Sequence, residues 1–145
     1  MDGAFGKVLV VDDEPKICAV LNAFLKTRGY QVMSASSGQE AMTAVLRERP
    51  DVVLLNVGMP EAGGTEVFKQ IRALDPRARV IMITDDGDEE RTKRFLAMGA
   101  FDCVAKPLDL NYLDRAVVAL VTERVLEKSS ESPVSKPPKL TPESG

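Results

Sequence analysis

Charged and polar side chains follow several short apolar runs of this 145-residue sequence, at the point where each run ends. Asp12 and Asp13 follow the run KVLVV. Thr84 ends the run RVIMIT, and Lys106 follows FDCVA. Paired carboxylates suit a hard divalent ion such as Mg²⁺, which prefers oxygen ligands. A lysine ammonium and a threonine hydroxyl suit the oxygens of a phosphoryl group. These residue types predict a site that handles a phosphoryl group beside a metal ion.

A further strand-end position carries an amide. The stretch DVVLLNVGMP breaks into a loop after Asn56, where this chemistry calls for a carboxylate. An acyl phosphate forms by attack of a carboxylate oxygen, whereas an amide nitrogen is not a nucleophile and its oxygen is a poor one. We therefore expect no phosphorylation at Asn56, and weaker Mg²⁺ binding because one negative charge is missing. The amide can still accept a hydrogen bond from Lys106, so the fold need not suffer.

The elements that must position these residues alternate along the chain. Runs typical of buried strands lie at residues 7–13, 30–36, 51–56, 79–84 and 101–107, and amphipathic helical patterns at 15–29, 37–50, 63–76, 88–100 and 110–128. Strands separated by helices of this length imply right-handed crossovers. The expected fold is α/β: a doubly wound, flavodoxin-like, five-stranded parallel sheet in the order 2-1-3-4-5, flanked by five helices. Ligands of such sheets bind at the carboxyl ends of the strands.

Local signals support these helices. Ser37 and Glu40 have the spacing of a capping box, Gly29 is a stop signal, and Asp109 is expected to cap the last helix. Apolar residues at helical spacing predict the core-facing stripes. These residues are Ile17, Val20, Leu21, Phe24, Leu25, Ala41, Val45, Leu46, Val67, Phe68, Ile71, Leu74, Leu110, Leu113, Val117, Leu120 and Val121.

The composition argues against several classes of function. A net charge of −3 gives no reason to expect nucleic-acid binding, and no apolar run is long enough to span a bilayer. The start MDGAFGK lacks the pattern of a secretory signal. Cys18 and Cys103 lack metal-site spacing and are expected to be buried free thiols in a reducing compartment. We therefore expect a cytoplasmic protein.

The composition also divides the chain into three parts. Residues 1–6 are expected to be a leader and residues 7–128 the folded domain. Residues 129–145 are rich in Ser, Pro and Lys and have little apolar surface to bury, so we expect a disordered tail or linker.

Four stretches occur together in one order: VLVVDDEP, PDVVLLNVGMP, VIMIT and GAFDCVAKP. In these stretches, and over residues 7–128 as a whole, the chain resembles the receiver domain of two-component response regulators. The resemblance implies a signalling module rather than an enzyme. Its implied partners are a sensor histidine kinase or a phosphotransfer protein, with no nucleic acid or membrane bound by this domain.

The resemblance also assigns roles at the site. Position 56 is the phosphoacceptor, an aspartate in the family and Asn56 in this chain. Thr84 and Lys106 bind the phosphoryl oxygens, and Thr84 shifts to signal phosphorylation. The implied Mg²⁺ ligands are Asp12, Asp13, Asn56 and the backbone carbonyl of Gly58.

Two further positions depart from the family pattern. Cys103 stands where receivers usually carry Tyr or Phe as a switch coupled to Thr84, and a small thiol cannot swing a ring between two positions. In TDDGDEE, an acid follows Thr84 where a small residue is usual. We expect Asp85, Asp86 and Asp88 to cap or favour the N-terminus of the next helix, and we keep altered metal or donor preference as the alternative.

Two other functions stay open. The first is a receiver-like domain that signals by phosphate-independent binding of a protein or ligand. The second is a Mg²⁺-dependent phosphohydrolase, which would need an aspartate nucleophile after a strand and a second acid nearby. Asp12 and Asp13 are adjacent rather than alternate, and this spacing argues against the phosphohydrolase.

Assembly is predicted only from the resemblance. Receivers often dimerise through their fourth helix, fifth strand and fifth helix, and a long last helix often leads to an output domain, here beyond residue 145. The sequence leaves open the cognate kinase, the pathway, the oligomeric state and whether Asn56 is native or engineered.

Overall fold

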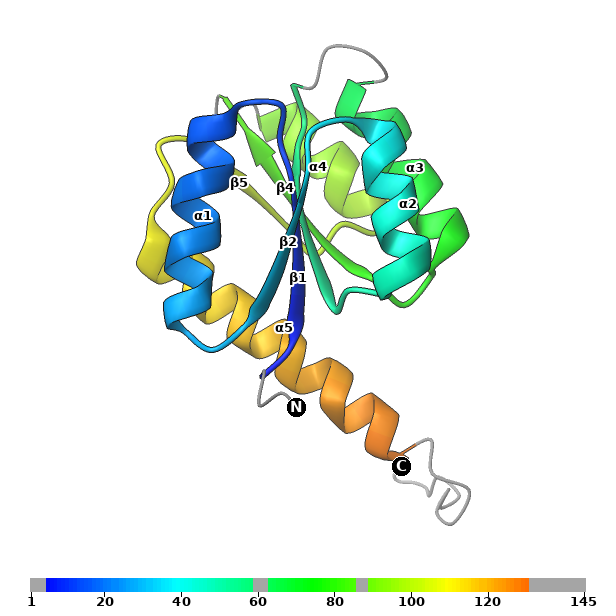
Figure 1. Cartoon of the computed structure of the whole chain (residues 1–145). Coiled ribbons are helices and arrows are strands. Elements are labelled where there is room, and N and C mark those ends of the chain that lie inside the picture. The colour runs from blue at the N-terminus through cyan, green and yellow to red at the C-terminus, as the bar shows by residue number, and fades with distance from the viewer. Residues whose placement is uncertain (1–4, 59–62, 86–88, 131–145) are drawn as a thin grey trace.

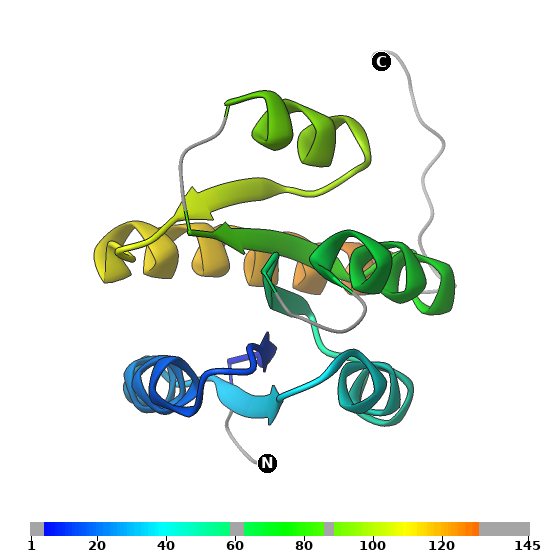
Figure 2. The same cartoon turned by 90° about the horizontal axis from the view of Figure 1, so that it is seen from above.

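The computed structural model describes residues 5–58, 63–85 and 89–130. The five strands form one parallel sheet in the order β2-β1-β3-β4-β5, which confirms the predicted fold class. Figure 1 shows the helices on both sides of the sheet, and Figure 2 shows the same layers from above. The elements in chain order are β1 (Lys7–Val11), α1 (Pro15–Thr27), β2 (Gln31–Ala35), α2 (Gly38–Glu48), β3 (Val52–Asn56), α3 (Gly63–Leu74), β4 (Arg79–Thr84), α4 (Glu89–Ala97), β5 (Asp102–Ala105) and α5 (Leu110–Ser130).

Hydrophobic side chains fill both faces of the sheet. Successive residues of a strand point to opposite faces, so Val8 and Val10 pack with residues of α1 and α5. Leu9 and Val11 pack with residues of α2, α3 and α4 on the other face. Strands β1, β3 and β4 are therefore apolar almost throughout, as central strands of a parallel sheet covered on both faces must be.

The helix ends carry most of the predicted signals. The Ser37 hydroxyl accepts a hydrogen bond from the Glu40 backbone N–H at 3.1 Å, as a capping box requires. The Glu40 carboxylate reaches back to the backbone N–H of Ser36 at 2.8 Å, one residue earlier than the capping box predicts. Asp109 accepts from two backbone N–H groups of the first turn of α5. Gly29 has φ +95°, which suits a helix stop.

Two residues of the predicted stripes are exposed instead of buried. Val20 is 54% exposed and Leu46 is 52% exposed. Each adjoins a fully buried residue, Leu21 or Val45, and one step along an α-helix turns the side chain by about 100°. The sequence pattern therefore overestimates the width of both stripes.

The two cysteines are free, as expected, but both are half-buried rather than buried. Cys18 lies on the side of α1 toward the edge strand β2, and Cys103 lies on the other edge strand, β5. Edge strands have a neighbour on one side only, so side chains there keep more contact with solvent.

Helix α5 carries both buried and exposed apolar residues among those that the structure describes. Leu113, Val117, Leu120 and Val121 are buried against the sheet, whereas Leu126 is 63% exposed. Figure 1 shows the later turns of α5 extending beyond the sheet. Across the described ranges, no helix combines the length and apolar character needed to cross a membrane.

Candidate functional site

The carboxyl ends of the central strands bring the predicted site residues to one edge of the sheet. Asp12 follows β1, Asn56 ends β3 and Thr84 ends β4. All three are buried, with exposures of 2%, 5% and 3%. Lys106 follows β5, and its backbone N–H donates to the Thr84 carbonyl at 2.8 Å. The parallel register therefore assembles residues that are up to 94 positions apart in the sequence (106 − 12).

Asn56 is held between the acid pair and the following loop. Its Nδ2 donates to Asp12 Oδ1 at 3.2 Å and to Asp13 Oδ1 at 3.5 Å. Its Oδ1 accepts from the backbone N–H of Gly58 at 3.0 Å. The reversed amide would place oxygen against two carboxylates and an NH₂ group against an N–H, so the network fixes the orientation.

The hydrogen bond that Asn56 could accept from Lys106 is not formed between these two described residues. The amide oxygen is taken by the Gly58 backbone, and the lysine ammonium turns to carboxylates. Lys106 Nζ lies 3.9 Å from Asp12 Oδ2 and 3.4 Å from Asp85 Oδ1. The peptide bond between Lys106 and Pro107 is cis.

Asp12 carries a buried carboxylate that is only partly satisfied. Its Oδ1 accepts from the Glu14 backbone N–H at 2.9 Å and from Asn56. Its Oδ2 is buried and accepts no hydrogen bond from the described residues. Burial raises the pKa of Asp12, while the Glu14 N–H, the Lys106 charge and the Asn56 amide act in the opposite direction. The nearest described cation, Lys106 Nζ, lies 3.9 Å from this oxygen, beyond hydrogen-bond distance, so the oxygen can still accept a closer cationic partner.

The oxygen donors fit a hard divalent cation incompletely. The buried Asp12 Oδ2 and the exposed Asp13 suit such an ion. However, the amide hydrogens of Asn56 point at the acid pair, where a third carboxylate would offer an oxygen. In the ranges that the structure describes, no group of three or more His, Cys, Asp or Glu side chains is placed to hold a metal. A metal at this site would need Asn56 or backbone oxygens to complete its ligand set.

Cys103 lies beside the core rather than in the pocket. Its side chain packs partly buried against the core cluster on the α2, α3 and α4 face. The neighbouring Asp102 accepts a hydrogen bond from the hydroxyl of Tyr112 on α5. This link between β5 and α5 raises the pKa of Tyr112 through its hydrogen bond to the carboxylate. The sequence carries no local signal for this pairing, because it depends on how α5 crosses β5.

Asp85 has a contact that the sequence did not predict. The three acids Asp85, Asp86 and Asp88 were expected to cap or favour the N-terminus of the next helix, whereas the Asp85 carboxylate pairs with Lys106. Asp86 and Asp88 lie outside the described residues. Cys18 is a second neighbour of the site, because its thiol donates to the Asp12 carbonyl at 3.3 Å. Burial raises the pKa of this thiol.

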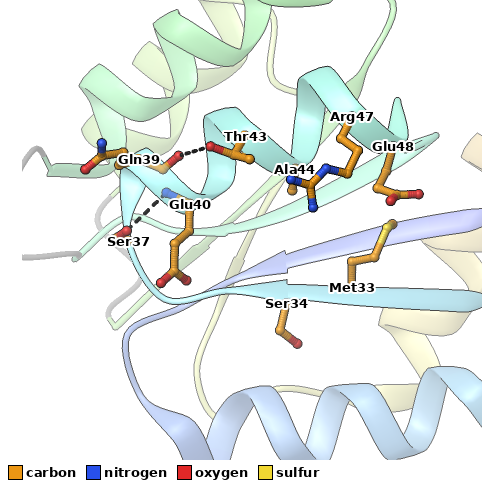
Figure 3. Close-up of a pocket in the computed structure, with 9 residues that line it drawn as sticks. All are labelled: Met33, Ser34, Ser37, Gln39, Glu40, Thr43, Ala44, Arg47 and Glu48. Carbon is orange, nitrogen blue, oxygen red and sulfur yellow. Dashed lines mark hydrogen bonds between the residues drawn. The ribbon is translucent and has the colours of Figure 1, made fainter.

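The site adjoins a shallow depression of about 310 Å³ that Asp12, Asp13 and Cys18 help to line. A larger depression of about 590 Å³ lies between β2 and α2 (Figure 3). None of the strand-end residues lines it, and the dashed contacts in Figure 3 are helix bonds such as the Ser37 cap. The larger of these two depressions is therefore not the one beside the clustered carboxylates and lysine.

The sequence matches the family described as response regulator receiver domain over residues 8–118. This chain belongs to that family. It is similar to Sporulation initiation phosphotransferase F of Bacillus subtilis (strain 168), with 36% identity over 111 residues that cover 77% of this chain and 90% of the relative. It is also 33% identical to Regulatory protein AtoC of Escherichia coli (strain K12), over 88% of this chain. The match spans only 26% of AtoC, about a quarter of that relative.

A solved structure supports the same assignment. The crystal structure of the CheX–CheY–BeF₃–Mg²⁺ complex from Borrelia burgdorferi matches with a TM-score of 0.69 and 31% identity. It covers 83% of this chain and 89% of the solved chain. Receiver domains are signalling modules of two-component systems that bind Mg²⁺ and interact with histidine kinases or phosphotransfer proteins, and several relatives of this receiver carry output domains.

Proposed function

We propose that this chain is a receiver whose phosphoacceptor position is Asn56, so that it is not phosphorylated there as the sequence stands. The observation that carries the proposal is the place of Asn56 at the end of β3, between the acid pair and the Gly58 backbone. A carboxylate there would face the acid pair, Asp12 and Asp13. An amide has no oxygen nucleophilic enough to attack phosphorus.

The roles of the other residues follow from their charges. Asp12, Asp13, Asn56 and the Gly58 carbonyl would hold Mg²⁺, which would neutralise charge on phosphoryl oxygens. We propose that Asn56 weakens this binding, because its N–H groups point toward the carboxylates. Lys106 supplies an ammonium to an anion in the pocket, and Thr84 a hydroxyl. We keep Thr84 as the residue that reports occupancy, while Cys103 lacks the ring for the usual coupled switch.

An apolar groove lies next to the pocket. This groove of about 240 Å³ is lined by α1 and by the segment after β5, beside Lys106. Its lining includes the exposed Val20. We propose that a sensor histidine kinase or phosphotransfer protein docks on this groove, since a phosphoryl donor must approach the same edge of the sheet. Its apolar residues are Ile17, Val20, Leu21, Pro107, Leu108 and Leu110.

The assembly proposals rest on the β5 edge of the sheet, around α4, β5 and α5. Exposed apolar side chains occur on α4, before β5 and on α5, and they support a homodimer through these elements. They are Leu96, Phe101, Tyr112 and Val118. We also propose that an output domain follows residue 145, that residues 1–6 and 129–145 flank the receiver proper, and that the protein acts in the cytoplasm without enzymatic turnover of its own.

A phosphate-independent receiver is the second candidate function. It is favoured because polar groups of the pocket already pair with one another. The Asn56 amide donates to Asp12, and the Asp85 carboxylate forms an ion pair with Lys106. A phosphohydrolase is not favoured by the geometry. Asp12 is buried, and its Oδ1 is held by the Glu14 N–H and by Asn56.

Intact mass after incubation with acetyl phosphate and Mg²⁺ tests the proposal. The chain as it stands is expected to gain no mass, and Asn56→Asp is expected to gain one phosphoryl group. Asn111→Asp makes the same chemical change at an exposed position and serves as the matched control. If neither the chain nor Asn56→Asp gains mass, the phosphate-independent candidate is preferred. Phosphorylation of the unchanged chain would contradict the assignment of Asn56.

A further inference from the structure

Asp85 places a carboxylate over the pocket. Its side chain is 75% exposed, yet its Oδ1 lies 3.4 Å from Lys106 Nζ. On the other side of the pocket mouth, its Oδ2 lies 3.6 Å from the point where a Cβ on Gly58 would stand. Asn56 Oδ1 lies 3.7 Å from that same point. One acidic side chain therefore extends from the lysine after β5 toward the loop after β3.

Lys106 is shared between two acids of unequal access. The ion pair with Asp85 is shorter than the ion pair with Asp12, at 3.4 Å against 3.9 Å. Asp12 is buried and fixed by hydrogen bonds, whereas Asp85 reaches the lysine from the solvent side. An anion that enters the pocket also arrives from solvent. It would therefore meet the Asp85 carboxylate at the ammonium group that it needs.

Two other roles for Asp85 fit the geometry less well. A metal-binding role needs Asp85 grouped with the acid pair, and the described residues contain no such group of three. A capping role needs contact with the first turn of α4, which begins four residues later at Glu89. Among the described residues, the charged partner of Asp85 is Lys106.

We propose that Asp85 is a resident counter-ion of Lys106 and competes with phosphate-bearing anions for the pocket. The proposal rests on the role of Lys106 as the anion-binding group, given under Proposed function. Its direction is fixed by charge, because an incoming anion must displace Asp85 before it can pair with the lysine. The expected effect of Asp85 on anion affinity is modest, because exposed ion pairs contribute little free energy in water.

Titration with inorganic phosphate, followed by the backbone amide NMR shifts of Gly58, Thr84 and Lys106, tests this competition. Asp85→Asn keeps the shape of the side chain and removes its charge. We expect it to lower the apparent Kd for phosphate roughly two- to fivefold. Glu89→Gln is the matched control, because Glu89 is exposed and forms no ion pair within the described ranges. It is expected to leave the Kd unchanged.

A double-mutant cycle separates competition from simple repulsion. Lys106→Ala by itself is expected to weaken or abolish phosphate binding. In that background, competition predicts that adding Asp85→Asn brings no gain in phosphate affinity. An equal gain in that background would show direct repulsion and overturn the proposal. Equal gains from Asp85→Asn and Glu89→Gln would overturn it too, as would phosphate binding to none of the variants.

The outcome is independent of the test of phosphorylation. Phosphate titration needs no acceptor at position 56. If Asn56→Asp takes up a phosphoryl group while Asp85→Asn leaves phosphate affinity unchanged, only the role of Asp85 fails. If Asp85→Asn tightens phosphate binding through Lys106 while Asn56→Asp stays unmodified, the counter-ion stands and the acceptor assignment fails.

Discussion

The side-chain amide of Asn56 donates a hydrogen bond to Asp12 Oδ1 across 3.2 Å, and both residues are almost fully buried. The same amide nitrogen lies 3.5 Å from Asp13 Oδ1. Two carboxylates that would otherwise face a third negative charge are thus bridged by a neutral donor. This arrangement predicts that the identity of residue 56 controls stability as well as phosphorylation.

Replacement of Asn56 by Asp is expected to destabilise the fold in the absence of divalent ions. The substitution removes the donor to Asp12 and adds a like charge at the same place, at a cost of about 1–3 kcal/mol at neutral pH. Added Mg²⁺ should recover much of this loss, because it binds the folded state. Urea unfolding with EDTA and with Mg²⁺ measures both effects. Asn111→Asp should show neither, and equal behaviour of the two variants would contradict the bridging role.

Gly64 is expected to be the least replaceable residue around the loop after β3. A Cβ at this position would lie 2.4 Å from the Val57 Cα and 2.7 Å from the Val57 carbonyl oxygen. These are backbone atoms, so Gly64→Ala must displace the chain next to Gly58 and should cost roughly 3 kcal/mol or more.

Gly63→Ala is the control for this clash. A Cβ there meets nothing within 4 Å, but φ is +76°, so the cost should be about 1–2 kcal/mol of backbone strain alone. Urea midpoints of the two variants give the comparison. A smaller loss for Gly64→Ala than for Gly63→Ala would show that the loop adjusts freely.

Tyr30 is expected to make the protein less stable at high pH. Burial raises its pKa to about 12, and its hydroxyl has no hydrogen-bond partner in the described part of the chain. As the pH rises, the unfolded chain loses this proton near pH 10, before the folded chain does. The contribution of protonated Tyr30 to the free energy of unfolding is therefore fully present below pH 10 and is lost between pH 10 and 12. The loss attributable to Tyr30 should be about 2–3 kcal/mol.

Tyr30→Phe should remove this part of the pH dependence and be nearly neutral at pH 7, since the buried hydroxyl is unpaired. Urea unfolding at pH 8, 10 and 11.5 provides the comparison. Tyr112→Phe is the control, because Tyr112 is more exposed and should leave most of the alkaline loss in place. The same alkaline slope in Tyr30→Phe and in the unchanged chain would refute this assignment.

The proposed homodimer predicts unequal effects at two exposed valines. Val118 on α5 lies in the proposed dimer surface, and Val20 on α1 lies in the proposed partner groove. Val118→Glu should weaken self-association at least about tenfold, because a charge would be buried in an apolar contact. Val20→Glu should leave it unchanged. Sedimentation velocity over a concentration series makes the measurement, and a monomer at all concentrations would count against the dimer.

The sequence by itself determined the architecture and the place of the site. Apolar runs such as VVLLN alternate with amphipathic helices, and this alternation leads to a parallel sheet whose strand ends meet at one edge. Asp12, Asn56, Thr84 and Lys106 could be grouped for that reason alone. Helix caps such as Asp109 were equally readable, because they involve groups only a few residues apart.

Only the tertiary structure decided which groups pair within that site. Lys106 could have turned to Asn56, and it turns to Asp12 and Asp85 instead. Val20 and Leu46 fit a core stripe by spacing and are exposed, because the neighbouring elements cover a narrower face than the pattern indicates. These outcomes depend on the positions of side chains from separate strands and helices, to within an ångström or so. The spacing of apolar residues along the sequence carries no information about such small distances, whereas packing and hydrogen-bond geometry depend on them.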